Sequence, residues 1–258
     1  MRLVKYCRPQ DNITRGAQLR LGTLNEYRDI ENDELRDESE GRYDFLVDFQ
    51  GPAVVDNRTL QAMFGNALRL PGVVGRYSGE MQAYVHTMEV ETTPHGVSIV
   101  RNASVEMTHL VSNCLILCTS RVDDGEDILP GPFAQYSDHW SIEGESADEF
   151  ARRLQTLIVE QIDAAMLELG GSEIATLRAS VSHGPVGYAD RQPVLTADNF
   201  PTYEELASIL NKLHFTKPIR FAREKEYRFV FELHDDKLRR IYPREALLVS
   251  VPELLSNL

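Results

Sequence analysis

The feature that most constrains the fold is a late segment in which two kinds of residue alternate. Over 221–232 (FAREKEYRFVFE) the pattern has a period of two, which is the period of a β-strand. One face of the predicted strand is mostly apolar, and the other carries carboxylates and a guanidinium. The first face holds Lys225, Tyr227, Phe229 and Phe231, and the second holds Glu224, Glu226, Arg228, Val230 and Glu232. Such a strand buries one face in a core, so the segment predicts a protein built on sheets.

The charged face of this strand has two interpretations. A Glu-x-Glu spacing on a strand projects the carboxylates of Glu224 and Glu226 into the same space. Repulsion between the two carboxylates then raises a carboxyl pKa, or a cationic partner binds to them. The alternative is a solvated outer sheet face with cross-strand ion pairs. Charged residues mostly lie on surfaces, so the strand alone favours this alternative.

The length and composition predict a globular protein. The chain has 258 residues, of which 42% are hydrophobic and 26% are charged. We expect one domain over 1–258, with a β-rich middle at 43–121 and room for a helical insertion at 146–213. No apolar run approaches the roughly 20 residues of a membrane span, and the first residues lack the apolar stretch of a signal peptide. We therefore expect a soluble cytoplasmic protein with no membrane partner.

The charge is negative overall and unevenly spread. The net charge of −13 argues against general DNA binding by long-range attraction. Residues 26–44 hold nine acids and three arginines, whereas residues 215–244 hold nine bases and five acids. Nine carboxylates cannot be buried with so few cations nearby. We therefore expect 26–44 to be mostly exposed, with Tyr27 and Arg28 as the residues that face inward.

The cysteines do not suggest a disulfide framework or a metal site. Three cysteines are few for a chain of this length, and no Cys-x-x-Cys pair occurs. His109, Cys114 and Cys118 are close in sequence, but both thiols lie on one face of a predicted strand and the imidazole lies on the other. Buried, reduced cysteines are the favoured interpretation, and we expect no metal ligands.

Short strands dominate the rest of the chain, which predicts the α+β class with mixed or antiparallel sheets and two late helices. The helices are predicted from Ser146 and Thr202, each followed by a glutamate three residues later as in a capping box. Residues 123–144 are predicted to be an irregular loop, and 171–200 are ambiguous. The other predicted strands are 3–7, 18–23, 45–49, 81–91, 97–101, 104–109, 113–119 and 247–251.

The late strand requires strand neighbours and a helix over its apolar face. We expect residues 224–232 to pair with 3–7 or with 113–119. The helix predicted over 147–169 has an apolar stripe that would cover the sheet. The stripe residues expected to make this contact are Leu154, Ile158, Ile162 and Met166.

Several short segments resemble an uncharacterised bacterial family of intracellular proteins. They are Lys5-Tyr6, 19–28 (LRLGTLNEYR), 36–41 (RDESEG), 215–217 (FTK) and 224–228 (EKEYR). Their layout is similar to that of ADP-ribosyltransferases, including phage-defence toxins that modify nucleic acid. The resemblance covers about the first 40 residues and 215–232. It implies an ADP-ribosyltransferase-like α+β fold and NAD as the substrate.

The resemblance also implies roles for particular residues. Glu226 would be the late catalytic glutamate, and Glu224 would be its partner. A carboxylate there stabilises the positive charge that builds on the sugar when the nicotinamide–ribose bond breaks. Tyr27 would stack on nicotinamide, and an arginine fork would hold the pyrophosphate. The implied NAD-binding set is Lys5, Tyr6, Arg20, Tyr27, Arg28 and Arg228. The chain departs from the pattern where the family has Ser-Thr-Ser, because Cys118-Thr119-Ser120 stands at the corresponding position.

Two functions of different classes follow. The first is an NAD-dependent ADP-ribosyltransferase of a defence or toxin system, with RNA, DNA or protein as acceptor and an antitoxin or chaperone as partner. The second is a non-catalytic sensor or adaptor whose segment 36–38 binds a partner. The position of Glu226 separates them. A transferase places Glu226 in a cleft with Lys5, Tyr6 and Tyr27, whereas an adaptor leaves it on an open sheet face or in an ion pair.

Overall fold

The chain forms two compact units, each built from separate stretches of sequence. The computed structural model describes residues 1–29, 37–38, 40–65, 70, 80–128, 136–168, 176–189 and 192–251. The first unit contains 1–40, 113–188 and 219–258, and the second contains 41–112 and 189–218. Mostly antiparallel sheets with few helices confirm the α+β class. No described helix is long and apolar enough to cross a membrane.

The first unit is built on a nine-stranded sheet. Its longest path runs β15-β2-β6-β13-β14-β8, while β1 pairs with β6 and β7, and β9 pairs with β13. The strands are β1 (Arg2–Cys7), β2 (Leu19–Thr23), β6 (Leu115–Val122), β7 (Asp138–Glu143), β8 (Leu167–Glu168), β9 (Leu177–Pro185), β13 (Glu226–Asp235), β14 (Arg240–Pro243) and β15 (Leu247–Val249).

Strand β13 lies inside this sheet, between β6 and β9, and is antiparallel to both. The predicted pairing with 113–119 is confirmed, because Phe229 pairs with Leu117 of β6. The strand begins later than predicted. Residues Ile219–Glu224 form the 3-10 helix η7, and Lys225 follows it with a φ of 44°. A left-handed residue breaks the extended backbone, so the prediction that Glu224 lies on the strand is wrong.

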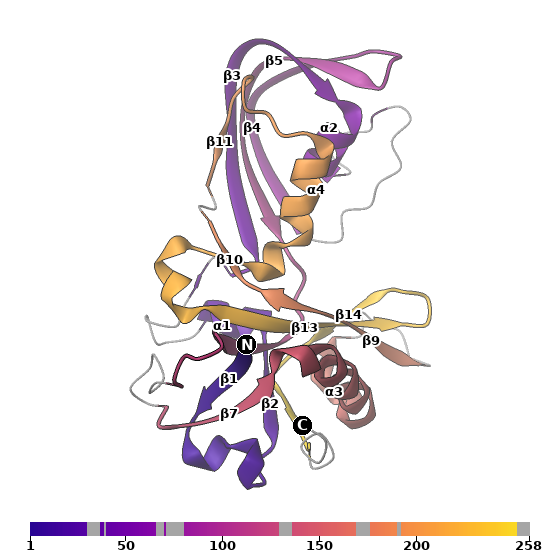
Figure 1. Cartoon of the computed structure of the whole chain (residues 1–258). Helices are drawn as coiled ribbons and strands as arrows, with labels where there is room; N and C mark the ends of the chain where they lie inside the picture. The colour runs from indigo at the N-terminus through magenta and orange to yellow at the C-terminus, as the bar shows by residue number, and fades with distance from the viewer. Residues whose placement is uncertain are drawn as a thin grey trace. The chain divides into compact units, whose positions relative to one another are not determined.

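The apolar face of β13 is buried as predicted. Tyr227, Phe229 and Phe231 belong to the main hydrophobic core. Helix α3 (Ala147–Gln161) covers the sheet (Figure 1), and the rings of Phe150 and Phe229 lie 5.2 Å apart. Edge-to-face aromatic pairs of this kind add to the free energy of burial.

Helix α3 begins at Ala147 as predicted, but it ends earlier and lacks the predicted capping box. Leu154 and Ile158 are buried in the core, but the helix ends at Gln161 rather than 169. Asp163 accepts a hydrogen bond from the Ala165 N–H, which starts the 3-10 helix η5 (Ala164–Met166) in place of a longer α-helix. The capping box predicted at Ser146 is wrong, because its side chain makes no capping hydrogen bond. A 3-10 turn, η4 (Gly144–Ser146), leads into α3 instead.

Several strands were not predicted, and β7 and β9 are the longest of them. Strand β7 lies in the stretch expected to be a loop, although Trp140 and Ile142 alternate with polar residues and are buried. Strand β9 lies in the ambiguous stretch 171–200. The remaining short elements of the unit are η1 (Pro9–Asp11), η2 (Ile13–Arg15), α1 (Leu24–Asp29) and β10 (Gly187–Tyr188).

The second unit is a four-stranded sheet that curves around two helices (Figure 1). Its order is β11-β3-β5-β4, with β11 parallel to β3 and the other pairs antiparallel. Helix α4 begins with the capping box predicted at Thr202 and Glu205, which is confirmed. The elements are β3 (Arg42–Asp56), α2 (Asn57–Phe64), β4 (Glu80–Thr92), β5 (Val97–Leu110), β11 (Val194–Leu195), α4 (Tyr203–Asn211), η6 (Leu213–Phe215) and β12 (Thr216–Lys217).

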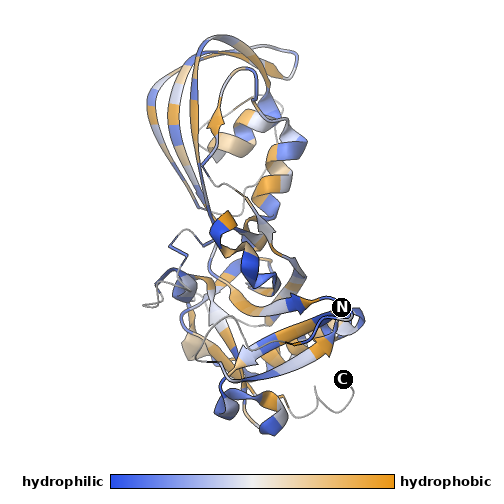
Figure 2. Cartoon of the chain, turned by 60° about the vertical axis from the view of Figure 1, so that its left-hand side comes forward, coloured by the Kyte–Doolittle hydropathy of each residue, from blue (hydrophilic) through white to orange (hydrophobic). Residues whose placement is uncertain are grey.

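The long strands of this unit bend at irregular positions. Residues 97–110 form one strand rather than the two predicted, although Asn102 has a φ of 47°. The register of β3 and β5 shifts between Phe49 and Pro52. Such bulges bend a strand and increase its twist. Polar and apolar residues alternate along these strands (Figure 2), as expected for a sheet with one covered face.

The acidic segment is less exposed than predicted. Tyr27 and Arg28 are partly buried, in agreement with the prediction that they face inward. Asp37 and Glu40, however, are each only 1% exposed, so the prediction of an exposed segment is wrong for them. Residues 30–36, which hold three of the acids, and 169–175, which include the predicted end of the long helix, lie outside the described residues.

Candidate functional site

The strongest polar feature of the first unit is the pair Glu226 and Arg228 on β13. These residues are two apart, so their side chains leave the strand on the same face, opposite Tyr227 and Phe229. Glu226 is 5% exposed and Arg228 is 2% exposed. Arg228 Nε donates to Glu226 Oε1 at 2.6 Å. The predicted solvated sheet face is therefore wrong, and both faces of β13 are buried at this point.

Glu40 completes a buried Glu–Arg–Glu network. Arg228 Nη1 donates to Glu40 Oε1 at 2.7 Å, and Nη2 donates to Glu40 Oε2 at 3.0 Å. This is the two-pronged geometry that makes arginine–carboxylate pairs strong. Burial lowers the pKa of Arg228, but the charges of Glu226 and Glu40 outweigh it and raise that pKa well above its usual range. The guanidinium is therefore a fixed cation between two carboxylates.

Tyr27 and Cys118 lie beside this network. Burial raises the pKa of Cys118 to about 12, and Glu226 adds to this by its charge and by a hydrogen bond with the thiol. Burial also raises the pKa of Tyr27 well above its usual range. A charge interaction and a hydrogen bond with Cys118, and the charge of Glu226, raise it further. Both groups are consequently neutral near pH 7. A protonated thiol is a poor nucleophile, so Cys118 contributes packing and a hydrogen bond rather than reactivity.

The backbone around Glu226 is also fixed. The Glu226 N–H donates to the Tyr188 hydroxyl at 2.8 Å, and its carbonyl accepts from the Val186 N–H at 2.9 Å. The preceding carbonyl, of Lys225, accepts from the Arg121 N–H at 2.8 Å. A carboxylate on such a backbone, bonded to a buried guanidinium, has little freedom to turn toward a ligand.

Some of the residues implied by the ADP-ribosyltransferase resemblance come together. Tyr27 lies beside Glu226 and Arg228. Arg28 Nε donates to the Glu40 carbonyl at 2.7 Å, so it fixes the backbone of the residue that binds Arg228. Glu224 does not join them through the strand, because it ends η7 ahead of the left-handed Lys225.

Of the two residues proposed for the first strand, Lys5 lies close enough to Cys118 for its charge to lower the pKa of that thiol, against the larger effect of burial. Both lie on β1, where Lys5 pairs with Trp140 of β7 and Tyr6 pairs with His139. The rings of Tyr6 and His139 are 6.4 Å apart. Burial raises the pKa of Tyr6. These contacts give Lys5 and Tyr6 a place in the β1–β7 ladder.

A pocket of about 370 Å³ lies next to Tyr27. Thr23 and Glu26 cap helix α1 at this pocket, since the Glu26 carboxylate accepts from the Thr23 N–H at 2.9 Å and the Thr23 hydroxyl accepts from the Glu26 N–H at 3.2 Å. Arg20 Nη2 lies 3.0 Å from Glu26 Oε1. The lining includes Arg20, Thr23, Glu26, Tyr27, Asp29 and Arg244. Glu226 is not among the described residues that line it.

Sequence reasoning missed two members of this site. Glu40 is one acid in a cluster of nine, and nothing in its local sequence separates it from its neighbours. Gly22 lies under the Tyr27 ring, where a Cβ would be 3.1 Å from Tyr27 Cε2. The Gly22-Thr23 pair within a predicted strand was the available signal, because glycine in a strand often marks close approach of another group.

Comparison with known proteins gives no relative for this chain: no protein-family model, no curated protein and no solved structure matches it. Within the described ranges, no group of three His, Cys, Asp or Glu side chains is placed to hold a metal ion.

Proposed function

We propose that this chain is a non-catalytic sensor or adaptor rather than an NAD-dependent enzyme. The observation that carries the proposal is the state of Glu226, which is buried and bonded to Arg228 at 2.6 Å. An electrostatic catalyst must direct its charge at the position where charge develops in the substrate. The Glu226 carboxylate is directed at a guanidinium of its own strand.

The network is well suited to a structural role. Arg228 binds Glu40 by two hydrogen bonds and Glu226 by one, and Arg28 holds the Glu40 backbone. These contacts join residues 188 positions apart in the chain. They fix the end of the acidic segment to the central strand of the sheet. An adaptor needs this kind of rigid attachment, because an ordered surface loses less conformational entropy when a partner binds.

An ADP-ribosyltransferase is the second candidate, and one observation favours it. Arg20 and Tyr27, two of the residues implied to bind NAD, line the same pocket as Arg244. Guanidinium groups suit a pyrophosphate, and a tyrosine ring suits stacking on nicotinamide. In this proposal Glu226 would have to exchange Arg228 for the ribose, and the acceptor would be RNA, DNA or protein.

An assay with labelled NAD tests the two candidates. The full chain is incubated with labelled NAD and, in turn, with cell extract, RNA, DNA and protein acceptors. We expect neither transfer of the label nor release of nicotinamide. A cleavage activity that is lost in Glu226→Gln would overturn the proposal and establish the transferase.

The matched control is Glu232→Gln. Glu232 lies on the same strand and the same face, but its carboxylate is partly exposed and pairs with Arg240 at 2.8 Å. A transferase that uses Glu226 would tolerate the change at Glu232. For an adaptor, Glu226→Gln is instead expected to lower the unfolding temperature more than Glu232→Gln, with no effect on NAD, because only Glu226 belongs to the buried network.

A further inference from the structure

The second unit contains a larger hollow, of about 730 Å³, between helix α4 and strand β3. Its walls are mostly apolar. Tyr43 and Phe45 come from β3, and Leu206 and Ile209 come from consecutive turns of α4. Leu195 of the short strand β11 and Pro201 add to these apolar walls. The volume lies within the range of about 300–1,000 Å³ that is typical of small-molecule sites.

The hollow exists because the elements beside α4 are short. Strand β11 has two residues, so it covers little of the edge of β3. Pro201 precedes the N-cap of α4, and a proline restricts the backbone that leads into the helix. Tyr43, Phe45, Leu195 and Leu206 are nevertheless buried side chains. Their packing fixes the position of these walls.

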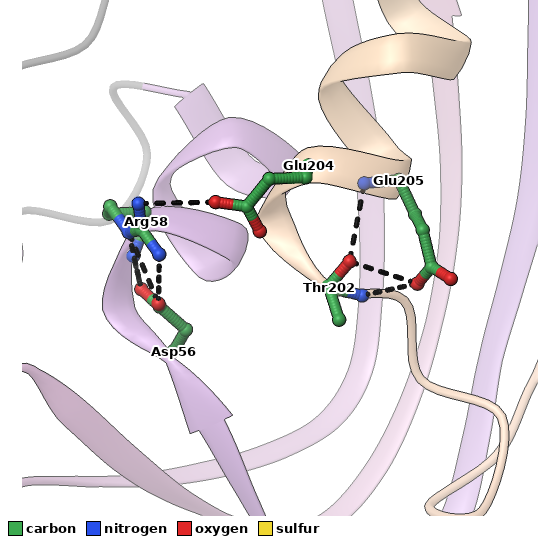
Figure 3. A network of polar contacts seen from close by, with 5 residues as sticks. All are labelled: Asp56, Arg58, Thr202, Glu204 and Glu205. Atoms are coloured by element: carbon green, nitrogen blue, oxygen red, sulfur yellow. Dashed lines mark hydrogen bonds and ion pairs between the residues drawn. The ribbon is translucent and has the colours of Figure 1, made fainter.

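Figure 3 shows two carboxylates in the first turn of α4, those of Glu204 and Glu205. Both residues belong to the lining of the hollow. Glu205 Oε2 accepts from the Thr202 N–H at 2.8 Å and from the Thr202 hydroxyl at 3.0 Å. These hydrogen bonds lower the pKa of Glu205, so it is ionised near pH 7. Glu204 has a side chain that is 70% exposed.

Arg58, a cation close to Glu204, is already paired with another acid. Arg58 Nη2 donates to Asp56 Oδ2 at 2.8 Å, whereas its Nη1 lies 3.4 Å from Glu204 Oε1 (Figure 3). The Arg58 guanidinium also lies over the Tyr203 ring, 4.9 Å from its centroid. The described lining of the hollow includes Glu204 and Glu205 and no lysine or arginine. This lining therefore carries a net negative charge that a cationic group would complement.

We propose that this hollow binds a small organic amine, with its apolar body between α4 and β3 and its ammonium group at Glu204. The apolar walls supply the free energy of burial. The Glu204 carboxylate selects a cationic ligand and fixes its orientation. The site rests on residues of the second unit alone, so it goes beyond the proposed function and holds whether or not the Glu226 network is catalytic.

A pair of matched ligands tests separately the binding of the apolar body and the recognition of the ammonium group. The full chain, with labelled methyl groups, is titrated with 3-phenylpropylamine and with 3-phenylpropan-1-ol, which has the same apolar body and no charge. We expect both to shift the methyl signals of Leu206 and Ile209. The amine should bind about five-fold more tightly, the size expected for one charge contact near a surface.

Three variants locate the site and its charge. Ser208→Trp places a large side chain in the hollow from an exposed position on α4, and should abolish the shifts with both ligands. Glu204→Gln should reduce the affinity for the amine to about that for the alcohol. Glu149→Gln is the control, because Glu149 is an exposed acid in the first turn of α3 in the other unit.

Four outcomes would overturn the proposal. Equal affinity for amine and alcohol would remove the cationic preference, and unchanged binding in a folded Ser208→Trp variant would place the ligand elsewhere. An absence of binding by both ligands up to their solubility limits would remove the small-molecule site. Shifts of the same methyl groups with protein concentration alone would assign the hollow to a second copy of the chain.

Discussion

Arg228 and Glu226 form an ion pair within a single strand, with 2.6 Å between Nε and Oε1 and both side chains buried. Glu40 then takes the other two guanidinium nitrogens. Removal of one ion from a buried network leaves the others without compensation. The behaviour of Arg228 variants is therefore the most direct test of the network.

Arg228→Ala is expected to lower the free energy of unfolding by about 3–5 kcal/mol, because two buried carboxylates lose their cation. Arg240→Ala is the control, since Arg240 forms a partly exposed pair with Glu232 at 2.8 Å and should cost at most about 1 kcal/mol. Urea denaturation followed by circular dichroism measures both. Equal losses in the two variants would contradict a dominant buried network.

Gly22→Ala is expected to displace the Tyr27 ring. A Cβ at Gly22 would lie 3.1 Å from Tyr27 Cε2 and 3.2 Å from its hydroxyl oxygen. Overpacking of this kind costs about 1–3 kcal/mol. Gly184→Ala is the control, because Gly184 pairs with Arg228 on the neighbouring strand and a Cβ there meets no atom within 4 Å. Thermal unfolding compares the two, and a harmless Gly22→Ala would mean that the ring adapts.

The cysteines are expected to resist alkylation in the folded protein. Burial raises the pKa of Cys118 to about 12, and it also raises the pKa values of Cys114 and Cys7. Since the thiolate is the reactive form, a thiol reagent at pH 8 should react slowly until denaturant is added. Thiol titration with and without denaturant measures this. Fast reaction of one thiol in the folded state would show that its surroundings open readily.

The stability of the second unit is expected to fall in mild acid. Burial lowers the pKa of His109 from 6.5 to about 4, although its contact with the Met63 carbonyl opposes this. Between these pH values the unfolded chain binds the proton more readily than the folded chain. The contribution of neutral His109 to the free energy of unfolding is therefore fully present above about pH 6.5. It is lost as the pH falls toward 4, and the total loss is roughly 3 kcal/mol.

Denaturation of wild type and His109→Gln at pH 7.5 and pH 5 tests this dependence. Glutamine keeps a hydrogen-bonding group but does not titrate in this range. The wild type should lose more stability between the two pH values than the variant. The same loss in both proteins would assign the acid sensitivity to other groups.

Local sequence was enough to predict elements whose pattern is periodic. The alternation of Tyr227, Phe229 and Phe231 predicted a strand with one core face, and the structure confirms it. The same reasoning missed β7, although Trp140 and Ile142 carry the same alternation, because glycines and prolines nearby favoured a loop. The ends of elements were less predictable. Lys225 ends the extended backbone through its left-handed conformation, and Asp163 starts a 3-10 turn through a hydrogen bond. A hydrophobic pattern encodes neither effect.

The sequence by itself determined the α+β class, the two-faced strand and the position of Glu226 and Arg228 on one of its faces. Only the tertiary structure decided what that face meets. The charged residues of that face predicted exposure to solvent. Instead, Glu40, which lies 188 residues earlier in the chain, binds the Arg228 guanidinium, and the guanidinium is buried between two carboxylates. A pairing of this kind depends on the path of the whole chain. The interaction that decides the role of Glu226 was therefore absent from its local sequence.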